Sequence, residues 1–213
     1  MRIILLLTFL VALSCIQKKN ITPEKKFTQP SKQDFVCNYS VNKLRCKRLY
    51  ADYKTLPSPT KENQLVNFLK DSILPCWYGT EWDFNGTTEQ PGQGAIACGY
   101  FVTTVLRDAG VSINRYKIAK YAAEQIVTST CQPATIRRFR NVSLDSFSAQ
   151  TKRFGFGLYI VGLDNHVGFI LNDSTESYFI HSTYVEKRCV MKEKANESSV
   201  LGNSSYRIIG KIL

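Results

Sequence analysis

Histidine is scarce in this chain: His166 and His181 are the only two among 213 residues. Any reaction that needs an imidazole therefore has two candidates. The sequence also lacks Cys-x-x-Cys, which argues against a zinc ribbon or a thioredoxin-like redox site. No internal repeat is present, and after residue 14 no apolar stretch approaches the length of a transmembrane helix.

Negative charge is also in short supply, because 17 Asp and Glu stand against 28 Lys and Arg, a net charge of +11. Basic charge suits nucleic acid, anionic lipid headgroups or a carboxylate-rich cell wall. The cations are scattered rather than gathered in one run, so a solvated basic surface is the simplest interpretation. A hydrophobic content of 44% and an aromatic content of 12% are enough for a packed core, which excludes disorder of the whole chain.

The first fifteen residues are typical of an export signal. Arg2 precedes an apolar run over residues 3–13, which is too short to span a bilayer comfortably. Residues 12–15, Ala-Leu-Ser-Cys, are similar to a bacterial lipobox, in which the cysteine becomes the lipidated first residue. The alternative is an ordinary leader with Cys15 as a bystander. We expect export to the periplasm or cell envelope, attachment to the membrane through Cys15, and no nucleic-acid partner.

The chain is predicted to have three parts. Residues 1–15 form the signal and lipobox segment, residues 16–60 a polar tether, and residues 61–213 a catalytic domain. The tether is rich in lysine and interrupted by four prolines. Whether its part over residues 37–53 packs on the domain stays open.

Seven cysteines are present, and disulfides are permitted in an exported protein. Setting aside Cys15 for the lipid and Cys98 for chemistry leaves five, an odd number. Cys37 with Cys46 is the most local candidate pair. The sequence leaves the pairing open.

Helices are expected before strands in the catalytic domain. Apolar spacing predicts helices over 65–73, 98–109, 116–127 and 144–154, with ends at Pro75 and Gly110 for the first two. Strands are expected over 158–161, 166–171, 178–182 and 207–213, and a turn over 172–175 joins the middle two. This order predicts an α+β fold with an antiparallel sheet.

Cys98 lies where a Gly-rich loop meets a helix. Unpaired N–H groups at a helix N-terminus favour a thiolate, so we expect a nucleophile of lowered pKa. The residue also continues the apolar stripe of that helix. A buried, inert thiol is therefore the alternative for Cys98 taken alone.

The two histidines strengthen the first interpretation. A two-residue turn at 174–175 places His181 opposite position 168, diagonal to His166 on one sheet face. A slip of one residue would separate them. In the favoured register His166 pairs with Cys98, and His181 orients the ring. A zinc site made by the same three residues is the competing hypothesis, but the spacing is not that of metal ligands; we expect neither metal nor cofactor.

Three blocks of sequence carry a resemblance to a known family. They cover residues 77–86, residues 98–102, and the strands around Asn165-His166-Val167-Gly168 and Phe179-Ile180-His181. Together they are similar to the NlpC-type cell-wall cysteine peptidases, a papain-like family that acts on peptidoglycan. Ala97 stands where the family has Asp, and Gly99-Tyr100 where it has Ser-Gly.

The resemblance implies a papain-like fold with the nucleophile at a helix N-terminus and hydrolysis of amide bonds in peptidoglycan stem peptides. Cys98 would attack the carbonyl, with His166 as base and His181 as its partner. Trp82, which stands where the family has Tyr, and Tyr78 would contact the substrate. The family's cleavage site lies near the D-Glu–diamino acid bond.

Other functions remain open. An amidase or an acyltransferase would use the same cysteine and histidine, and a non-enzymatic cell-wall-binding lipoprotein would keep them as packing. Arg107, Arg137 and Arg138 could meet substrate carboxylates, although ordinary surface charge is the simpler interpretation. The sequence does not predict an oligomeric state.

Overall fold

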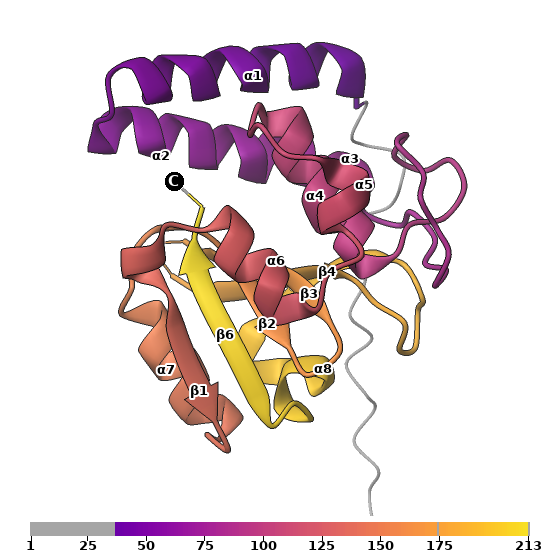
Figure 1. Cartoon of the computed structure of the whole chain (residues 1–213), viewed down its shortest axis with the longest axis vertical. Coiled ribbons are helices and arrows are strands. Elements are labelled where there is room, and N and C mark those ends of the chain that lie inside the picture. The colour runs from indigo at the N-terminus through magenta and orange to yellow at the C-terminus, as the bar shows by residue number, and fades with distance from the viewer. Residues whose placement is uncertain (1–36, 174, 213) are drawn as a thin grey trace, which may run out of the picture. The chain divides into compact units, whose positions relative to one another are not determined.

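The computed structural model describes residues 37–173 and 175–212. The signal segment 1–15 with Cys15, and the tether as far as residue 36, lie outside the described residues. The described chain contains helices and one six-stranded antiparallel sheet, which confirms the predicted α+β class (Figure 1). No helix in this part of the chain is long and apolar enough to cross a membrane.

Helices dominate the first half of the described chain and strands the second. The α-helices are α1 (Tyr39–Thr55), α2 (Pro59–Phe68), α3 (Leu74–Trp77), α4 (Cys98–Ala109), α5 (Arg115–Ile118), α6 (Ala123–Thr130), α7 (Leu144–Lys152) and α8 (Ser199–Gly202). The strands are β1 (Arg137–Arg140), β2 (Gly157–Leu163), β3 (Val167–Asn172), β4 (Ser177–Ser182), β5 (Val190–Lys194) and β6 (Tyr206–Lys211). A π-helical turn (Leu69–Ile73) joins α2 to α3, and short 3₁₀ turns cover Pro133–Thr135 and Ala195–Glu197.

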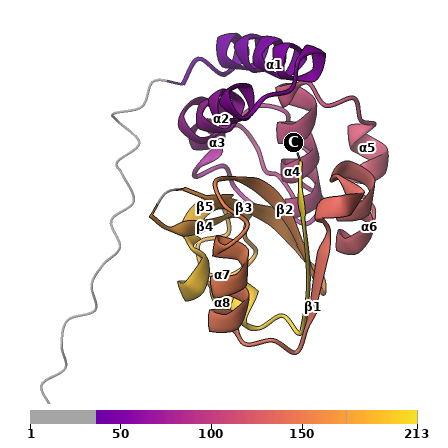
Figure 2. The ribbon, with the colours of Figure 1, turned by 90° about the vertical axis from the view of Figure 1, so that its left-hand side faces the viewer.

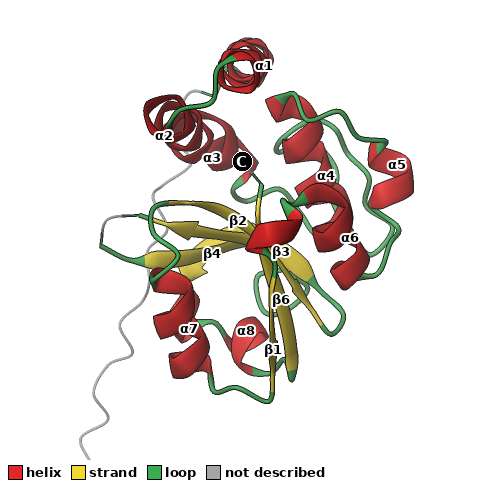
Figure 3. Cartoon of the chain, turned by 60° about the vertical axis from the view of Figure 1, so that its left-hand side comes forward, coloured by secondary structure: helices red, strands yellow, loops and turns green. Residues whose placement is uncertain are grey.

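The sheet has the strand order β1-β6-β2-β3-β4-β5, with every neighbouring pair antiparallel. Helices α2, α4 and α6 cover one face, and α7 and α8 cover the other (Figure 3). Each face therefore has its own apolar core. The central strands β2 and β3 are buried along their whole length, because both of their faces are covered.

Helix α4 matches its prediction at both ends. It buries Phe101, Val102 and Val105 against the sheet, in the apolar stripe seen in the sequence. Gly110 follows at φ 110°, a left-handed conformation that ends the helix at a low steric cost.

Pro75 does not end its helix as predicted. The chain continues through the π-helical turn into α3, and Pro75 occupies the first turn of α3. The N–H of Leu74 still donates to the carbonyl oxygen of Leu69, and Pro75 supplies no N–H for the next bond, a gap that the π-helical turn accommodates. Trp77, at the end of α3, is fully buried in the core.

Two further predictions need correction. The helix expected over 116–127 is divided into α5 and α6, because residues 119–122 leave the helix and turn toward the cleft described below. The edge strands β1 and β5 were not expected at all. Both are short and charged, as edge strands often are, so they lack a clear alternation of apolar residues.

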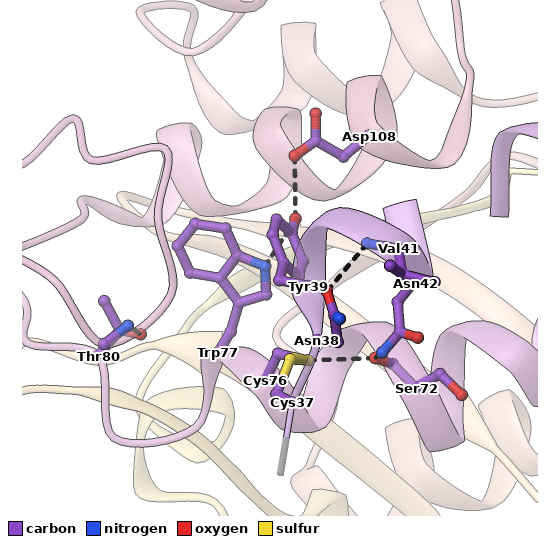
Figure 4. The surroundings of a disulfide bond; sticks show 11 residues. Cys37, Asn38, Tyr39, Val41, Asn42, Ser72, Cys76, Trp77, Thr80 and Asp108 are labelled. Atoms are coloured by element: carbon purple, nitrogen blue, oxygen red, sulfur yellow. Dashed lines mark hydrogen bonds between the residues drawn. A yellow bond between two sulfur atoms is a disulfide. The ribbon is translucent and has the colours of Figure 1, made fainter. Parts of the chain in front are cut away.

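The compact unit extends N-terminal of residue 61, because α1 belongs to it. This helix packs along α2 and α4 (Figure 2). The Tyr39 hydroxyl donates to Asp108 Oδ2 at 3.0 Å and accepts from Trp77 Nε1 at 3.0 Å (Figure 4). The part of the predicted tether from residue 37 therefore contributes to the core.

A disulfide joins Cys37 to Cys76, so the candidate pair Cys37–Cys46 does not form (Figure 4). Cys46 lies two turns into α1, about 10 Å along the axis from the helix start, which is too far for a bond to Cys37. It is instead fully buried as a free thiol. Cys76 lies on α3, and the disulfide fastens the start of α1 to this short helix.

Candidate functional site

Cys98 is the first residue of α4, and Ala97 before it is extended. The thiol is half-buried and belongs to a free cysteine. It lines a cleft of about 720 Å³ together with His166. The thiol of the predicted nucleophile and the ring of the predicted base therefore meet in one open space, although they come from a helix and from the start of a strand.

The β3–β4 hairpin has the register predicted from its turn. Phe169 pairs with Ile180 and Ile170 with Phe179, so that continuation of the ladder sets Gly168 opposite His181. A Cβ on Gly168 would lie 2.8 Å from the Cβ of His181 and 2.6 Å from the Phe179 ring. A glycine is needed at position 168 because these two side chains lie over its backbone.

His166 and His181 are in direct contact. Nε2 of His166 lies 2.9 Å from Nδ1 of His181, and both side chains are almost fully buried. The Phe179 ring stacks on His181 with a centroid distance of 4.0 Å, which fixes the plane of that imidazole. The Tyr184 ring meets His166 edge to face at 5.5 Å. One nitrogen of each ring is thus committed to the other ring.

The remaining nitrogen of His166, Nδ1, is buried and has no hydrogen-bond partner in residues 37–173 and 175–212. A buried polar atom without a partner is costly, and such atoms often mark a functional site. His166 and Cys98 line the same cleft, and Nε2 of His166 already faces His181, so Nδ1 is the nitrogen of this ring that is left for proton exchange. No hydrogen bond joins Nδ1 to the Cys98 thiol among the described residues.

The zinc hypothesis does not fit this geometry. A metal held by Cys98, His166 and His181 would require one nitrogen of each ring to point at a common centre. Nε2 of His166 and Nδ1 of His181 instead point at each other. Among the described residues, no group of three or more His, Cys, Asp or Glu side chains is placed to hold a metal ion.

Sequence reasoning missed Glu193, on the edge strand β5. Its Oε1 lies 3.3 Å from Nε2 of His181. Residue 191 pairs with His181 across the sheet, so Glu193 is the diagonal neighbour on the same face. Glu193 could have been found from the sequence only if strand β5 had been predicted. Its charged residues hide the apolar alternation by which a strand is recognised.

Electrostatics favour neutral rings and a neutral thiol. Burial and the neighbouring His181 hold the pKa of His166 well below its usual range. Burial also lowers the pKa of His181, and Glu193 partly opposes this. Burial raises the pKa of the Cys98 thiol, which backbone N–H groups of Val167, Gly99 and Cys98 itself offset only in part. The expected lowered thiol pKa is therefore wrong, because burial outweighs the helix N-terminus.

Five tryptophan, phenylalanine and tyrosine side chains line the cleft. The lining includes Trp82, Phe84, Tyr100, Tyr121 and Tyr184, and the Phe84 side chain is exposed at the rim. Among the described residues that line it, Lys120 is the one lysine, and there is no arginine, aspartate or glutamate.

Of the two predicted substrate contacts, Trp82 lines this cleft and Tyr78 does not. Gly79 has φ 81° and reverses the chain after α3, so the Tyr78 side chain packs against the main core instead. Burial raises the pKa of Tyr78. The Trp82 ring is held from behind by the Arg188 guanidinium, 4.9 Å from its centroid.

Arg115 fastens the loop before Cys98 to the helices. Its guanidinium donates to the carbonyl oxygens of Thr87 at 2.8 Å and Thr88 at 3.0 Å, and to Thr104 Oγ1 at 2.6 Å. It also contacts Glu89 Oε1 at 3.3 Å. The side chain is almost fully buried, so these bonds are shielded from water and hold one wall of the cleft.

The three arginines proposed for substrate carboxylates lie elsewhere. Arg107 pairs with Glu89 and Asp108, and Arg138 with Glu124. Arg137 donates to nearby carbonyl oxygens. None of the three lines the cleft.

Comparison of the chain with protein-family models, with curated proteins and with solved structures finds no match.

Proposed function

We propose that the chain is an exported, membrane-attached cysteine hydrolase with a papain-like catalytic arrangement. Its substrates would be amide bonds in peptidoglycan stem peptides. One observation carries the proposal: a thiol at a helix N-terminus and an imidazole from a strand line one cleft, with a second imidazole directly behind the first. The resemblance to NlpC-type peptidases supplies the substrate class.

The reaction follows from the positions of these groups. Cys98 gives its proton to Nδ1 of His166 as its sulfur bonds to the substrate carbonyl carbon, and the carbonyl electron pair moves onto oxygen. The first N–H groups of α4 are free to stabilise that oxyanion. The carbon–nitrogen bond then breaks, and His166 protonates the departing amine. A water molecule, deprotonated by His166, attacks the thioester and restores the thiol.

The protonation states make His166 a general base during attack rather than one half of a resting ion pair. A thiol of raised pKa beside a ring of lowered pKa stays neutral until the substrate arrives. Proton transfer and bond formation are then expected in the same step. Entry of substrate also excludes water from the cleft, which strengthens every interaction inside it.

Lys120 is the group we assign to a substrate carboxylate. Stem peptides carry carboxylates, and this ammonium group is the one lysine or arginine among the described lining residues. The aromatic walls would pack on the apolar faces of the peptide.

The aromatic lining of the cleft also favours a second candidate function, that of an acyltransferase. Trp82, Phe84 and Tyr100 would suit an apolar acyl group better than a charged peptide. The thioester on Cys98 would then pass to an amine or hydroxyl instead of water.

The test is digestion of purified muropeptides by the full chain, with product analysis by mass spectrometry. We expect new products with the natural chain and none with Cys98→Ala. Cys189→Ala is the matched control, because Cys189 is a half-buried free thiol that does not line the cleft. Products that carry a transferred acyl group would favour the acyltransferase. The absence of any Cys98-dependent product, cleaved or acylated, would contradict an enzymatic role and favour the cell-wall-binding lipoprotein.

A further inference from the structure

We propose that Glu193 is a positioning residue that sets the tautomers of both histidines and thereby leaves Nδ1 of His166 free to accept the thiol proton. The catalytic meaning of this inference rests on the proposed function. The arrangement of protons itself can be measured without any substrate.

The first link is between Glu193 and His181. Oε1 of Glu193 and Nε2 of His181 are 3.3 Å apart, which is an ion-pair distance. The contact lacks hydrogen-bond geometry, and both atoms are buried with no hydrogen-bond partner in the described part of the chain. Burial opposes ionisation of Glu193, yet its contacts with His181 and Ser198 lower its pKa overall. An ionised carboxylate at this distance repels a lone pair on Nε2 and attracts an N–H there, so it favours the tautomer of His181 that carries its proton on Nε2.

The second link follows because a neutral imidazole carries one proton. With Nε2 of His181 protonated, Nδ1 of that ring has a lone pair and accepts. The atom 2.9 Å away, Nε2 of His166, must then be the donor. The proton of His166 is thus fixed on Nε2.

The third link is the consequence for the cleft. With its proton on Nε2, His166 has a lone pair on Nδ1, the buried atom that has no partner in the described residues. Because His166 and Cys98 line the same cleft, that lone pair would accept the thiol proton when the two groups come together. With the opposite tautomers, Nδ1 of His166 would carry the proton and could not take another from the thiol.

Packing holds the chain of contacts from Glu193 through His181 to His166, here called the relay, in place. Phe179 stacks on His181 and Tyr184 contacts His166, so neither ring is free to flip. Carbon-rich neighbours of this kind provide no competing acceptor. The carboxylate of Glu193 is therefore the group that breaks the symmetry between the two tautomers.

The experiment uses nitrogen-15 NMR of the imidazoles in the untagged full chain. Because the chain has only two histidines, the spectrum contains two rings. We expect both rings of the natural chain to be protonated at Nε2 and unprotonated at Nδ1. Either ring found with its proton on Nδ1 would overturn the inference, without the need for any variant.

Glu193→Met removes the acceptor and keeps a side chain of similar length. We expect both rings to lose the Nε2–H preference together, and alkylation of Cys98 at neutral pH to slow at least tenfold. Glu197→Gln is the matched control: Glu197 is an exposed glutamate near β5 that pairs with Lys194. Tautomers that stay unchanged in Glu193→Met would contradict the proposal.

The two proposals can fail separately. A chain that leaves every muropeptide intact but shows the expected tautomers keeps the relay and loses the hydrolase assignment. A chain that cleaves muropeptides while the Glu193→Met variant retains both the tautomers and the turnover number keeps the hydrolase and loses the relay.

Discussion

Nε2 of His166 and Nδ1 of His181 face each other at 2.9 Å in a buried site, and this contact joins the residue before β3 to strand β4. The other nitrogen of His166 is buried, has no hydrogen-bond partner in the described residues and belongs to a residue that lines the cleft. The other nitrogen of His181 lies 3.3 Å from Oε1 of Glu193. The two rings therefore have different tasks. In the proposed reaction His166 exchanges protons with the reacting groups, and His181 holds the ring of His166.

Replacement of the two histidines should have unequal effects. We expect His166→Ala to lower turnover of a cleaved muropeptide by about a thousandfold, since a positioned acid–base group contributes roughly 10²–10⁴. His181→Ala leaves the base present but unsupported, so the loss should be about ten- to a hundredfold. The measurement is kcat by product chromatography. Equal, natural-like rates for both variants would contradict these roles.

Alkylation of Cys98 should require neutral to alkaline pH. Because burial raises the pKa of this thiol, the thiolate fraction below that pKa grows about tenfold per pH unit. Peptide mapping after brief iodoacetamide treatment at several pH values measures the rate at Cys98, with Cys189 as an internal comparison. A rate already at its plateau near pH 5 would instead indicate a preformed thiolate–imidazolium pair.

Mild acid should destabilise the folded chain through the histidine pair. Both pKa values are lowered in the folded state, so the unfolded chain takes up protons near pH 6.5 while the folded chain does not. The free energy of unfolding should therefore fall as pH drops below about 6.5, by at most ~1.4 kcal/mol per pH unit for each ring.

The window between pH 7 and 5.5 isolates this effect, since carboxylates of lowered pKa such as Glu89 and Glu193 lose their stabilising contribution only at lower pH. Urea unfolding at several pH values measures it. A flat profile for the natural chain, or the same slope in a double variant without the two histidines, would show that the rings are not buried in neutral form.

Loss of the disulfide should lower stability substantially. The bond between Cys37 and Cys76 closes a loop with a sequence separation of 39 residues, and the loop-entropy relation gives about 4 kcal/mol as an upper value. We expect Cys37→Ser with Cys76→Ser to unfold at lower urea concentration than the oxidised natural chain. Dithiothreitol should shift the natural chain in the same direction and leave the variant unchanged. An unshifted natural chain would refute the pairing.

Gly99→Ala should damage the cleft. A Cβ at this position would lie 2.3 Å from the carbonyl oxygen of Ala119, a backbone atom that cannot move independently. The clash should cost about 1–3 kcal/mol of stability and displace the wall formed by residues 119–121. Gly202→Ala is the control, because its Cβ would meet only Leu144 Cδ2 at 3.5 Å. Similar melting temperatures for both variants would contradict this packing.

The Gly99 contact also gives a physical reason for one departure from the family pattern. The resembled motif carries Ser after the nucleophile, and this chain has Gly. With the Ala119 carbonyl so close to α4, a serine side chain would not fit. The close packing of residues 119–122 on α4 therefore explains why glycine, and not serine, follows Cys98 in this chain.

Local patterns in the sequence determined much of the fold. The apolar stripe and Gly110 defined α4, and the turn after residue 172 defined the β3–β4 register, because helix periodicity, glycine conformation and strand alternation act over a few neighbouring residues. The sequence alone therefore placed Cys98 at a helix N-terminus and the two histidines on one sheet face.

Only the tertiary structure decided what lies around them. The partner of Cys37, the position of Tyr78 away from the cleft, and the approach of Glu193 to His181 all depend on contacts between segments far apart in the chain. Burial decided the charge states as well: the thiol's pKa rises because removal from water disfavours the thiolate more than the helix N-terminus favours it. Neither long-range packing nor desolvation is encoded in the spacing of neighbouring residues.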